Sequence, residues 1–177
     1  MTRHFTIREA TPRDTSSLLA LKRRLAEETK FLLLEPDEVP GEQALGDLLR
    51  TVNRTDNAAW FIAETGGEAA SNDGGNEAIG MLGVTGGSLA RNRATAKLFL
   101  GIAKQHWGRG LGRGLLSAAE DWARDKSVRR LELTVNTENE RARTLYKRMG
   151  FVTEGRMRAA LVVDGKPVDE YLMGKVI

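Results

Sequence analysis

Cysteine is absent from the 177-residue sequence, which excludes a disulfide framework and thiol catalysis. Long hydrophobic runs are absent too, and the N-terminus lacks the apolar segment of a signal peptide, so we expect a cytoplasmic protein without a membrane partner. A net charge of only +3 argues against a general nucleic-acid partner. The 41% hydrophobic content at this length predicts a single domain over residues 1–177.

Acidic residues are missing from one long stretch in the middle of the chain. Residues 78–119 contain no Asp or Glu, although the whole sequence has 24 of them. The same stretch contains several cations, namely Arg91, Arg93, Lys97, Lys104, Arg109 and Arg113. Such a cationic environment suits a ligand that carries several phosphates.

A strand, a glycine-rich turn and a helix are predicted in succession inside this stretch. Leu98, Leu100 and Ile102 alternate as on one face of a strand, and from Leu111 onward apolar residues recur at helical spacing. Between and within these segments glycine occupies every second position, at Gly108, Gly110, Gly112 and Gly114. Glycines allow close approach of a ligand, and a helix start presents free N–H groups, so this turn is a predicted phosphate site.

Two familiar phosphate-binding motifs do not fit this turn. A P-loop needs Gly-Lys followed by Ser or Thr, which is not present, and the third glycine of a dinucleotide fingerprint is replaced by Arg113 or Leu115. The turn instead resembles the pyrophosphate loop of the GNAT acetyltransferase superfamily, written Arg/Gln-x-x-Gly-x-Gly/Ala. Gly110 and Gly112 match that pattern, and Trp107 stands where Arg or Gln is usual.

A second motif follows at residues 139–151. Thr137 and Glu140 have the spacing of a capping box, and Gly150 is a natural residue to follow the helix end. The segment also resembles the GNAT pattern Asn-x-x-Ala-x-x-Leu-Tyr-x-x-x-Gly-Phe, which it matches at Asn139, Ala142, Leu145, Tyr146, Gly150 and Phe151.

The remaining segments complete the expected fold. Strands are predicted near Phe5–Arg8, at 58–64, 78–85, 94–102 and 128–135, and in the two arms around a turn at Asp164-Gly165. Helices are predicted from Thr11-Pro12 and over 44–52, and residues 65–77 are expected to form a flexible hairpin loop. The resemblance implies an α+β fold, called α/β in some schemes: a twisted, mixed, mostly antiparallel sheet of about six to seven strands, with helices on both faces and splayed central parallel strands.

The resemblance also implies an activity and a set of site residues. A GNAT enzyme transfers an acetyl group from acetyl-CoA to a primary amine by direct attack, without a metal. The backbone at Ile102 and Ala103 would hold the pantetheine arm and polarise the thioester, and Asn139 would contact the arm. The pyrophosphate would be held by residues 107–113, namely Trp107, Gly108, Arg109, Gly110, Leu111, Gly112 and Arg113. Tyr146 would act as general acid to the departing thiolate, because a phenol with a pKa near 10 is protonated at neutral pH.

The sequence does not identify the general base. Many relatives place a Glu on the fourth strand, where this chain has Lys97. The proton would leave through water or through a group from elsewhere, with Glu28 as the candidate that we carry forward. The alternatives are Glu35, Asp169, Glu170 and, beside the loop, His106, for which a partly exposed position near the phosphates is expected.

The acceptor is less defined than the acyl donor. The pattern at Glu154-Gly155-x-x-Arg158, Asp164-Gly165 and Asp169-Glu170-Tyr171-x-Met173 resembles small bacterial-type GNAT proteins that acetylate amino acids, amine-bearing toxins, polyamines or protein N-termini. A small-molecule or peptide amine is therefore expected as acceptor, and a homodimer as a further possibility. The alternative is a non-catalytic sensor that binds acetyl-CoA. A different nucleotide-binding module, such as a small kinase-like or dinucleotide-binding domain, is a further alternative, but the motif that such a module needs is missing from the sequence.

Overall fold

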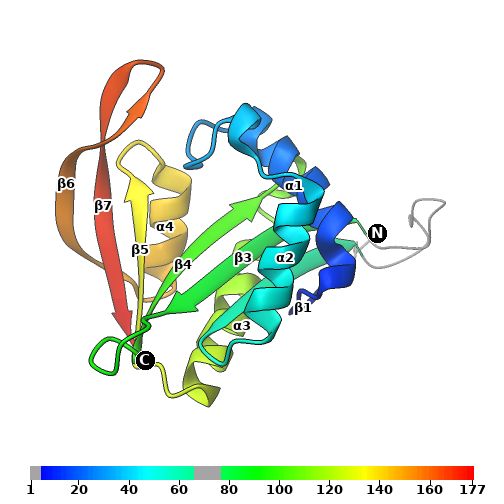
Figure 1. Ribbon diagram of the computed structural model, residues 1–177. Coiled ribbons are helices and arrows are strands. Elements are labelled where there is room, and N and C mark those ends of the chain that lie inside the picture. The colour runs from blue at the N-terminus through cyan, green and yellow to red at the C-terminus, as the bar shows by residue number, and fades with distance from the viewer. Residues whose placement is uncertain (1–4, 66–76) are drawn as a thin grey trace.

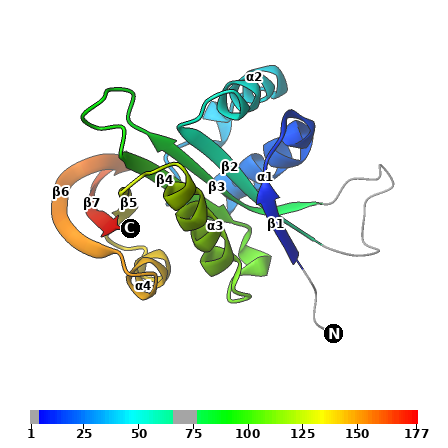
Figure 2. The same ribbon diagram turned by 90° about the horizontal axis from the view of Figure 1, so that it is seen from below.

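The computed structural model describes residues 5–65 and 77–177, which form one sheet of seven strands with helices against both of its faces (Figures 1 and 2). The strands are β1 (Phe5–Glu9), β2 (Ala58–Thr65), β3 (Ala78–Gly86), β4 (Thr95–Ile102), β5 (Arg130–Asn136), β6 (Val152–Val163) and β7 (Lys166–Val176). The helices are α1 (Thr15–Glu28), α2 (Glu42–Asn53), α3 (Leu111–Asp125) and α4 (Glu140–Arg148). This arrangement confirms the predicted α+β fold.

The sheet is mixed and opens at its centre. Its strand order is β1-β2-β3-β4-β5-β7-β6, and only β4 and β5 run parallel to each other. These two strands pair at only three positions, from Thr95 opposite Arg130 to Lys97 opposite Glu132, and then diverge. From Leu98 to Ile102, β4 pairs with β3 on one side while its other edge has no strand beside it in the described part of the chain. The predicted splay of the central parallel strands is confirmed.

Two clusters of buried side chains lie on the two faces of the sheet. The first face is covered by α1 and α2, with Leu21, Leu49 and Trp60 in its core. The opposite face is covered by α3 and α4 (Figure 2), and the apolar stripe of α3 that begins at Leu111 and includes Leu115 is buried against it, as its helical spacing predicts. Because both faces are covered, the sheet is a rigid support for the segments at the ends of its strands.

The first helical turn begins where the sequence predicts it. Thr11 is the N-cap of a short 3₁₀ turn at Pro12–Asp14, and Asp14 accepts the backbone N–H of Thr11 at 2.7 Å. The α-helix proper then begins at Thr15. The Asp14 carboxylate also receives two hydrogen bonds from Arg8 of β1, so this turn is tied to the sheet.

The strands of the two predicted hairpins pair antiparallel, each pair with local shifts of register. The N–H of Thr65 donates to the carbonyl of Glu77 at 3.1 Å, which closes β2 onto β3; the loop expected between them, residues 66–76, lies outside the described residues. The Asp164-Gly165 turn joins β6 to β7 with positive φ at both positions, which confirms the predicted hairpin. Within residues 5–65 and 77–177, no helix has the length and apolar character needed to cross a membrane.

Candidate active site

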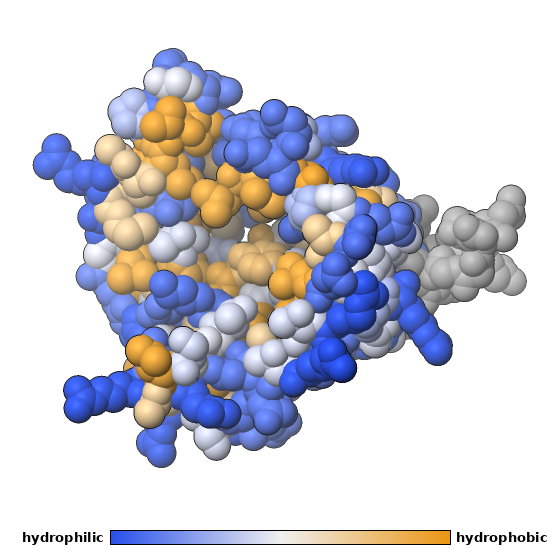
Figure 3. Space-filling model, viewed as in Figure 1, coloured by the Kyte–Doolittle hydropathy of each residue, from blue (hydrophilic) through white to orange (hydrophobic). Residues whose placement is uncertain are grey.

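A cavity of about 1340 Å³ lies where β4 and β5 diverge. Figure 3 shows this face of the molecule hollowed at that place, with hydrophobic residues around the opening. Its walls come from the end of α1 and the loop that follows, the last residues of β4, the glycine turn and α4. The volume exceeds that of a typical small-molecule pocket, so there is room for a ligand of several joined parts.

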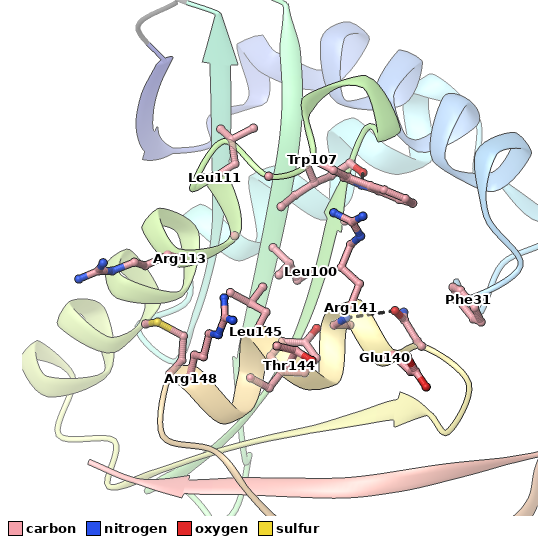
Figure 4. A pocket seen from close by; sticks show the side chains of 18 of the residues that line it. Phe31, Leu100, Trp107, Leu111, Arg113, Glu140, Arg141, Thr144, Leu145 and Arg148 are labelled. Carbon is pink, nitrogen blue, oxygen red and sulfur yellow. Dashed lines mark hydrogen bonds between the residues drawn. The ribbon is translucent and has the colours of Figure 1, made fainter. Parts of the chain in front are cut away.

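The cavity differs in character from one end to the other (Figure 4). At one end Arg113 and Arg148 project beside the start of α3, and we call this the basic end. At the other end Phe31 lies opposite them, and with Leu25 and Leu32 it forms what we call the apolar end. Among the described lining residues the cations are Arg113, Arg141, Arg148 and Lys175, and the carboxylates are Glu138 and Glu140.

The glycine turn at the basic end has the geometry of an anion site. Gly108 and Gly110 have φ of +76° and +83°, which favour glycine over other residues, and Gly110 is the N-cap of α3. The first helical hydrogen bond runs from the N–H of Gly114 to the carbonyl of Gly110. The N–H groups of Leu111, Gly112 and Arg113 therefore have no partner within the helix and stand at its positive end.

Gly112 serves packing rather than backbone conformation. A Cβ at this position would lie 2.6 Å from Cδ2 of Leu145 on α4. The missing side chain thus lets α3 and α4 approach each other at Gly112 and Leu145, which both line the cavity.

Most of the residues expected at the site line the cavity. These are Ile102, Trp107, Gly108, Gly110, Leu111, Gly112, Arg113, Asn139 and Tyr146. Three expected residues do not line it: Ala103, Arg109 and Glu28.

Ala103 is fully buried with its backbone already engaged. Its N–H donates to the carbonyl of Ile79 at 3.0 Å, and its carbonyl accepts the N–H of His106 at 2.9 Å. The expected role of Ala103 in holding a ligand arm stays a prediction, and only the second lone pair of its carbonyl is left to serve it.

Trp107 connects the turn to the two sides of the cavity. Its indole N–H donates to the carbonyl of Ile102 at 2.8 Å, and the Arg141 guanidinium lies 4.6 Å from its ring centroid. The Trp107 side chain thus supports the end of β4 and holds a cation of α4 over the cavity (Figure 4). This role differs from direct phosphate contact by an Arg or Gln at the same place.

Tyr146 is fixed by the end of α4. The N–H groups of Gly150 and Phe151 donate to the carbonyls of Lys147 and Tyr146, both at 3.0 Å, and Gly150 has φ +85°, which together form a Schellman motif. The ring of Phe151 packs edge-on to that of Tyr146 with centroids 5.9 Å apart. Only 6% of Tyr146 is exposed, and burial raises the pKa of its phenol above the usual range. The hydroxyl is therefore protonated at neutral pH.

The start of α4 differs from the sequence prediction. The predicted capping box of Thr137 and Glu140 is wrong: the N-cap is Asn139, whose Oδ1 accepts the N–H of Ala142 at 3.2 Å. Upstream, the side chain of Asn136 accepts the N–H of Glu138 and shapes the turn between β5 and α4. The helix therefore begins two residues later than a Thr137 cap would place it, at Glu140 instead of Glu138, because Asn139 supplies the cap.

The candidate bases are dispersed. Oε2 of Glu28 accepts the N–H of Lys104 at 2.7 Å, so this carboxylate caps the 3₁₀ turn at Lys104–His106 beside the cavity. His106 lines the cavity but is only 5% exposed, which corrects the expectation of a partly exposed side chain. Lys97 is 82% exposed and lies 3.9 Å from Glu132, away from the cavity wall.

The other carboxylates considered as bases also lie off the wall. Asp169 accepts hydrogen bonds from the N–H of Ala159 and from Arg156, which hold the pKa of its carboxyl below the usual range. Glu35 is exposed at the cap of a 3₁₀ turn, and Glu170 pairs with Asn136 between β7 and β5. None of these three is among the described residues that line the cavity.

Sequence reasoning missed Glu138 and Arg141. Both line the cavity, and both lie in or next to the motif that begins at Asn139. Their position beside a matched motif was the available signal, but only the structure shows that Glu138 lies opposite the loop that follows α1, where it pairs with Lys30. Within the described ranges, no group of three or more His, Asp or Glu side chains could hold a metal ion.

Comparison with known proteins shows the family. The model of the acetyltransferase (GNAT) family matches residues 23–151. The acetyltransferase of the GNAT family from Streptococcus pneumoniae is 34% identical, with 98% of this chain and 100% of that chain covered and a TM-score of 0.87. The structure of yncA from Salmonella typhimurium, solved with its cofactor acetyl-CoA, is 19% identical over 98% of this chain and 94% of that chain, with a TM-score of 0.82, and this likeness shows the fold.

A shorter match comes from mycothiol acetyltransferase of Beutenbergia cavernae, which is 48% identical over 59 residues. That match covers 33% of this chain, and it spans only about a fifth (20%) of the relative's length. The family match covers well over half of the chain and includes both motifs around the cavity. This chain therefore belongs to the GNAT family of acetyltransferases, whose acyl donor is acetyl-CoA.

Proposed function

We propose that this enzyme transfers the acetyl group of acetyl-CoA to a primary amine of a small molecule, such as an amino acid or related amine, or of a peptide N-terminus. The observation that carries the proposal is that the glycine turn, the open edge of β4 and the buried Tyr146 all border one cavity. The anion site would serve the phosphates of acetyl-CoA, the unpaired strand edge its extended arm, and the protonated acid its departing thiolate.

The acyl donor would lie along the cavity with its pyrophosphate at the basic end. The free N–H groups of Leu111, Gly112 and Arg113 would hold the phosphate oxygens. The pantetheine arm would then pair with the open edge of β4 between Leu98 and Ile102, in the manner of an added strand. Asn139 would contact the arm with its amide N–H groups, because its Oδ1 is used by the helix cap.

The transfer itself would be a direct attack. The amine nitrogen forms a bond to the thioester carbonyl carbon, and the carbon–sulfur bond breaks. Tyr146 gives its hydroxyl proton to the departing thiolate, and the proton that the nitrogen loses after the attack restores the phenol. An ammonium acceptor must lose another proton before the attack. We propose that this proton passes to Glu28 through an intervening water, because Glu28 lies behind the cavity wall with one carboxylate oxygen bound to the N–H of Lys104.

The experiment that tests the proposal is an assay of thiol release from acetyl-CoA with a panel of amino acids, polyamines, aminoglycosides and short peptides. Amine-dependent thiol release, with the N-acetylated product identified by mass, is the expected result. Tight binding of acetyl-CoA without release for any amine would overturn the proposal and favour a sensor.

A further inference from the structure

An ion pair crosses the opening of the cavity at its apolar end. Nζ of Lys30, in the loop after α1, lies 3.0 Å from Oε2 of Glu138, in the turn before α4. These two residues are 108 positions apart in the sequence, so the pair joins the two sides between which the cavity opens. Glu138 lines the cavity, whereas Lys30 is not among the described lining residues.

The Lys30 ammonium also lies near an aromatic ring. Its Nζ is 5.9 Å from the ring centroid of Phe31, which lines the cavity beside Glu138. A carboxylate and an aromatic face together form a favourable site for an ammonium ion. The protein's own lysine therefore occupies a site whose carboxylate and aromatic ring are suited to bind an amine.

We propose that Glu138, with Phe31, is the specificity-determining site for the positive charge of the acceptor, and that Lys30 occupies this site until an acceptor displaces it. The inference rests on the proposed function and specifies which side chain recognises the incoming amine. Leu25 and Leu32 would contact the apolar part of the same molecule.

The energetics allow the exchange. The side chains of Lys30 and Glu138 are 54% and 62% exposed, and an exposed ion pair of this kind contributes little to stability. A small amine can therefore replace Lys30 at little cost. Glu140 is the other carboxylate on the described lining, and it lies in the first turn of α4, where the helix N-terminus already stabilises its charge.

Two single substitutions distinguish this site from a simple clasp. Lys30→Met removes the competing cation, so the affinity for a cationic amine should rise about threefold. Glu138→Gln removes the carboxylate, so the affinity should fall about tenfold, as for the loss of a charge-assisted hydrogen bond. If the ion pair only held the two loops together, either substitution would lower the affinity for the amine by the same factor.

The probe is 2-phenylethylamine, titrated into the 177-residue protein with CoA bound and followed by NMR, with 2-phenylethanol as the uncharged analogue. The dissociation constant for the alcohol should change by less than a factor of two in both variants. The reversed pair, Lys30→Glu with Glu138→Lys, keeps an ion pair and should nevertheless lose amine binding. Glu77→Gln is the matched control, since Glu77 pairs with Arg24 of α1 at 2.8 Å outside the cavity lining.

Three results would overturn the inference. The first is an equal loss of amine affinity in both single variants. The second is an equal change in the dissociation constants of the amine and the alcohol. The third is the absence of saturable amine binding to both the wild type and Lys30→Met. The titration requires no turnover, so its outcome is separate from that of the thiol-release assay. If the amine binds in the expected pattern while no amine releases thiol, the proposed function fails and the binding site stands.

Discussion

The basic end and the apolar end of the cavity are constructed in different ways. At the basic end, the anion site is formed by one continuous stretch, from β4 through the glycine turn into α3. It presents backbone N–H groups, with the side chains of Arg113 and Arg148 beside them. At the apolar end, the opening is bordered by two segments, the loop after α1 and the turn before α4, which are 108 residues apart where Lys30 meets Glu138. A backbone site depends on chain conformation, whereas a side-chain site depends on which residues two loops bring together.

This difference explains how one fold can keep its acyl donor while its acceptor varies. Substitutions in the loop after α1 change the apolar end without altering the φ angles of Gly108 and Gly110. We therefore expect variants at the two ends to affect different kinetic parameters, and the following predictions test that separation from the largest effect to the smallest.

Tyr146→Phe should reduce kcat by about 10²- to 10⁴-fold, the usual range for loss of a general acid. The dissociation constant of acetyl-CoA should stay within a factor of two, because the ring and its contact with Phe151 are retained. Single-turnover kinetics and a binding titration measure the two effects. A variant with full kcat would show that Tyr146 only packs.

The pH profile gives an independent check on Tyr146. Because burial raises the pKa of the phenol, its proton is retained up to and beyond pH 10, so kcat should show no decline from Tyr146 ionisation in the accessible range. The unfolded chain loses this proton first, so stability should fall as the pH rises above about 10, and Tyr146→Phe should lessen that fall.

Glu28→Gln should reduce kcat/KM for the amine by about 10²-fold at neutral pH if Glu28 receives the amine proton. The amide oxygen can still accept the N–H of Lys104, so the melting temperature should change little. Raising the pH should restore activity, because more of the amine is then already deprotonated. An unchanged pH profile would assign Glu28 to capping alone.

Gly110→Ala should weaken acetyl-CoA binding about tenfold, because a positive φ strains a residue with a Cβ by about 1–2 kcal/mol and shifts the N–H groups of the turn. Gly165→Ala is the matched control: Gly165 has φ +71°, and a Cβ at either glycine would meet nothing within 4 Å. Both variants should lose similar stability, and only Gly110→Ala should lose affinity. Equal affinities would show that the turn does not hold the donor.

Lys97→Ala should have the smallest effect, with kcat, both KM values and stability nearly unchanged. Its side chain is 82% exposed and its 3.9 Å approach to Glu132 is a weak surface pair, worth less than about 0.5 kcal/mol. Thermal denaturation and steady-state kinetics are sufficient measurements. A clear loss of activity would show that the face of β4 that carries Lys97 takes part in catalysis.

The fold and the basic end could be predicted because their signals are local. Alternation at Leu98 and Leu100, the stripe from Leu111 and the glycines of the turn each reflect the conformation of one short segment. The hairpin at Asp164-Gly165 was equally local, since both residues tolerate positive φ.

The apolar end and the cap of α4 could not be predicted in the same way. The spacing of Thr137 and Glu140 fits a capping box, but Asn136 and Asn139 offer further side-chain acceptors in the same turn. Only the assembled turn shows that Asn136 binds the N–H of Glu138 and that Asn139 caps the helix. The ion pair of Lys30 with Glu138 depends on how far β4 and β5 diverge, which no local pattern records.

The pairing of β4 with β5 at only three positions also affects the lifetime of the protein against unfolding and proteolysis. On the proposed function, acetyl-CoA completes the sheet as an eighth, removable strand, and only the folded chain binds it. At a donor concentration one hundred times its dissociation constant, this linkage adds about 2.7 kcal/mol to the free energy of unfolding. Copies without donor would then be the first to open and to be cleaved by proteases, so the cell's supply of acetyl-CoA would regulate the amount of this enzyme as well as its rate.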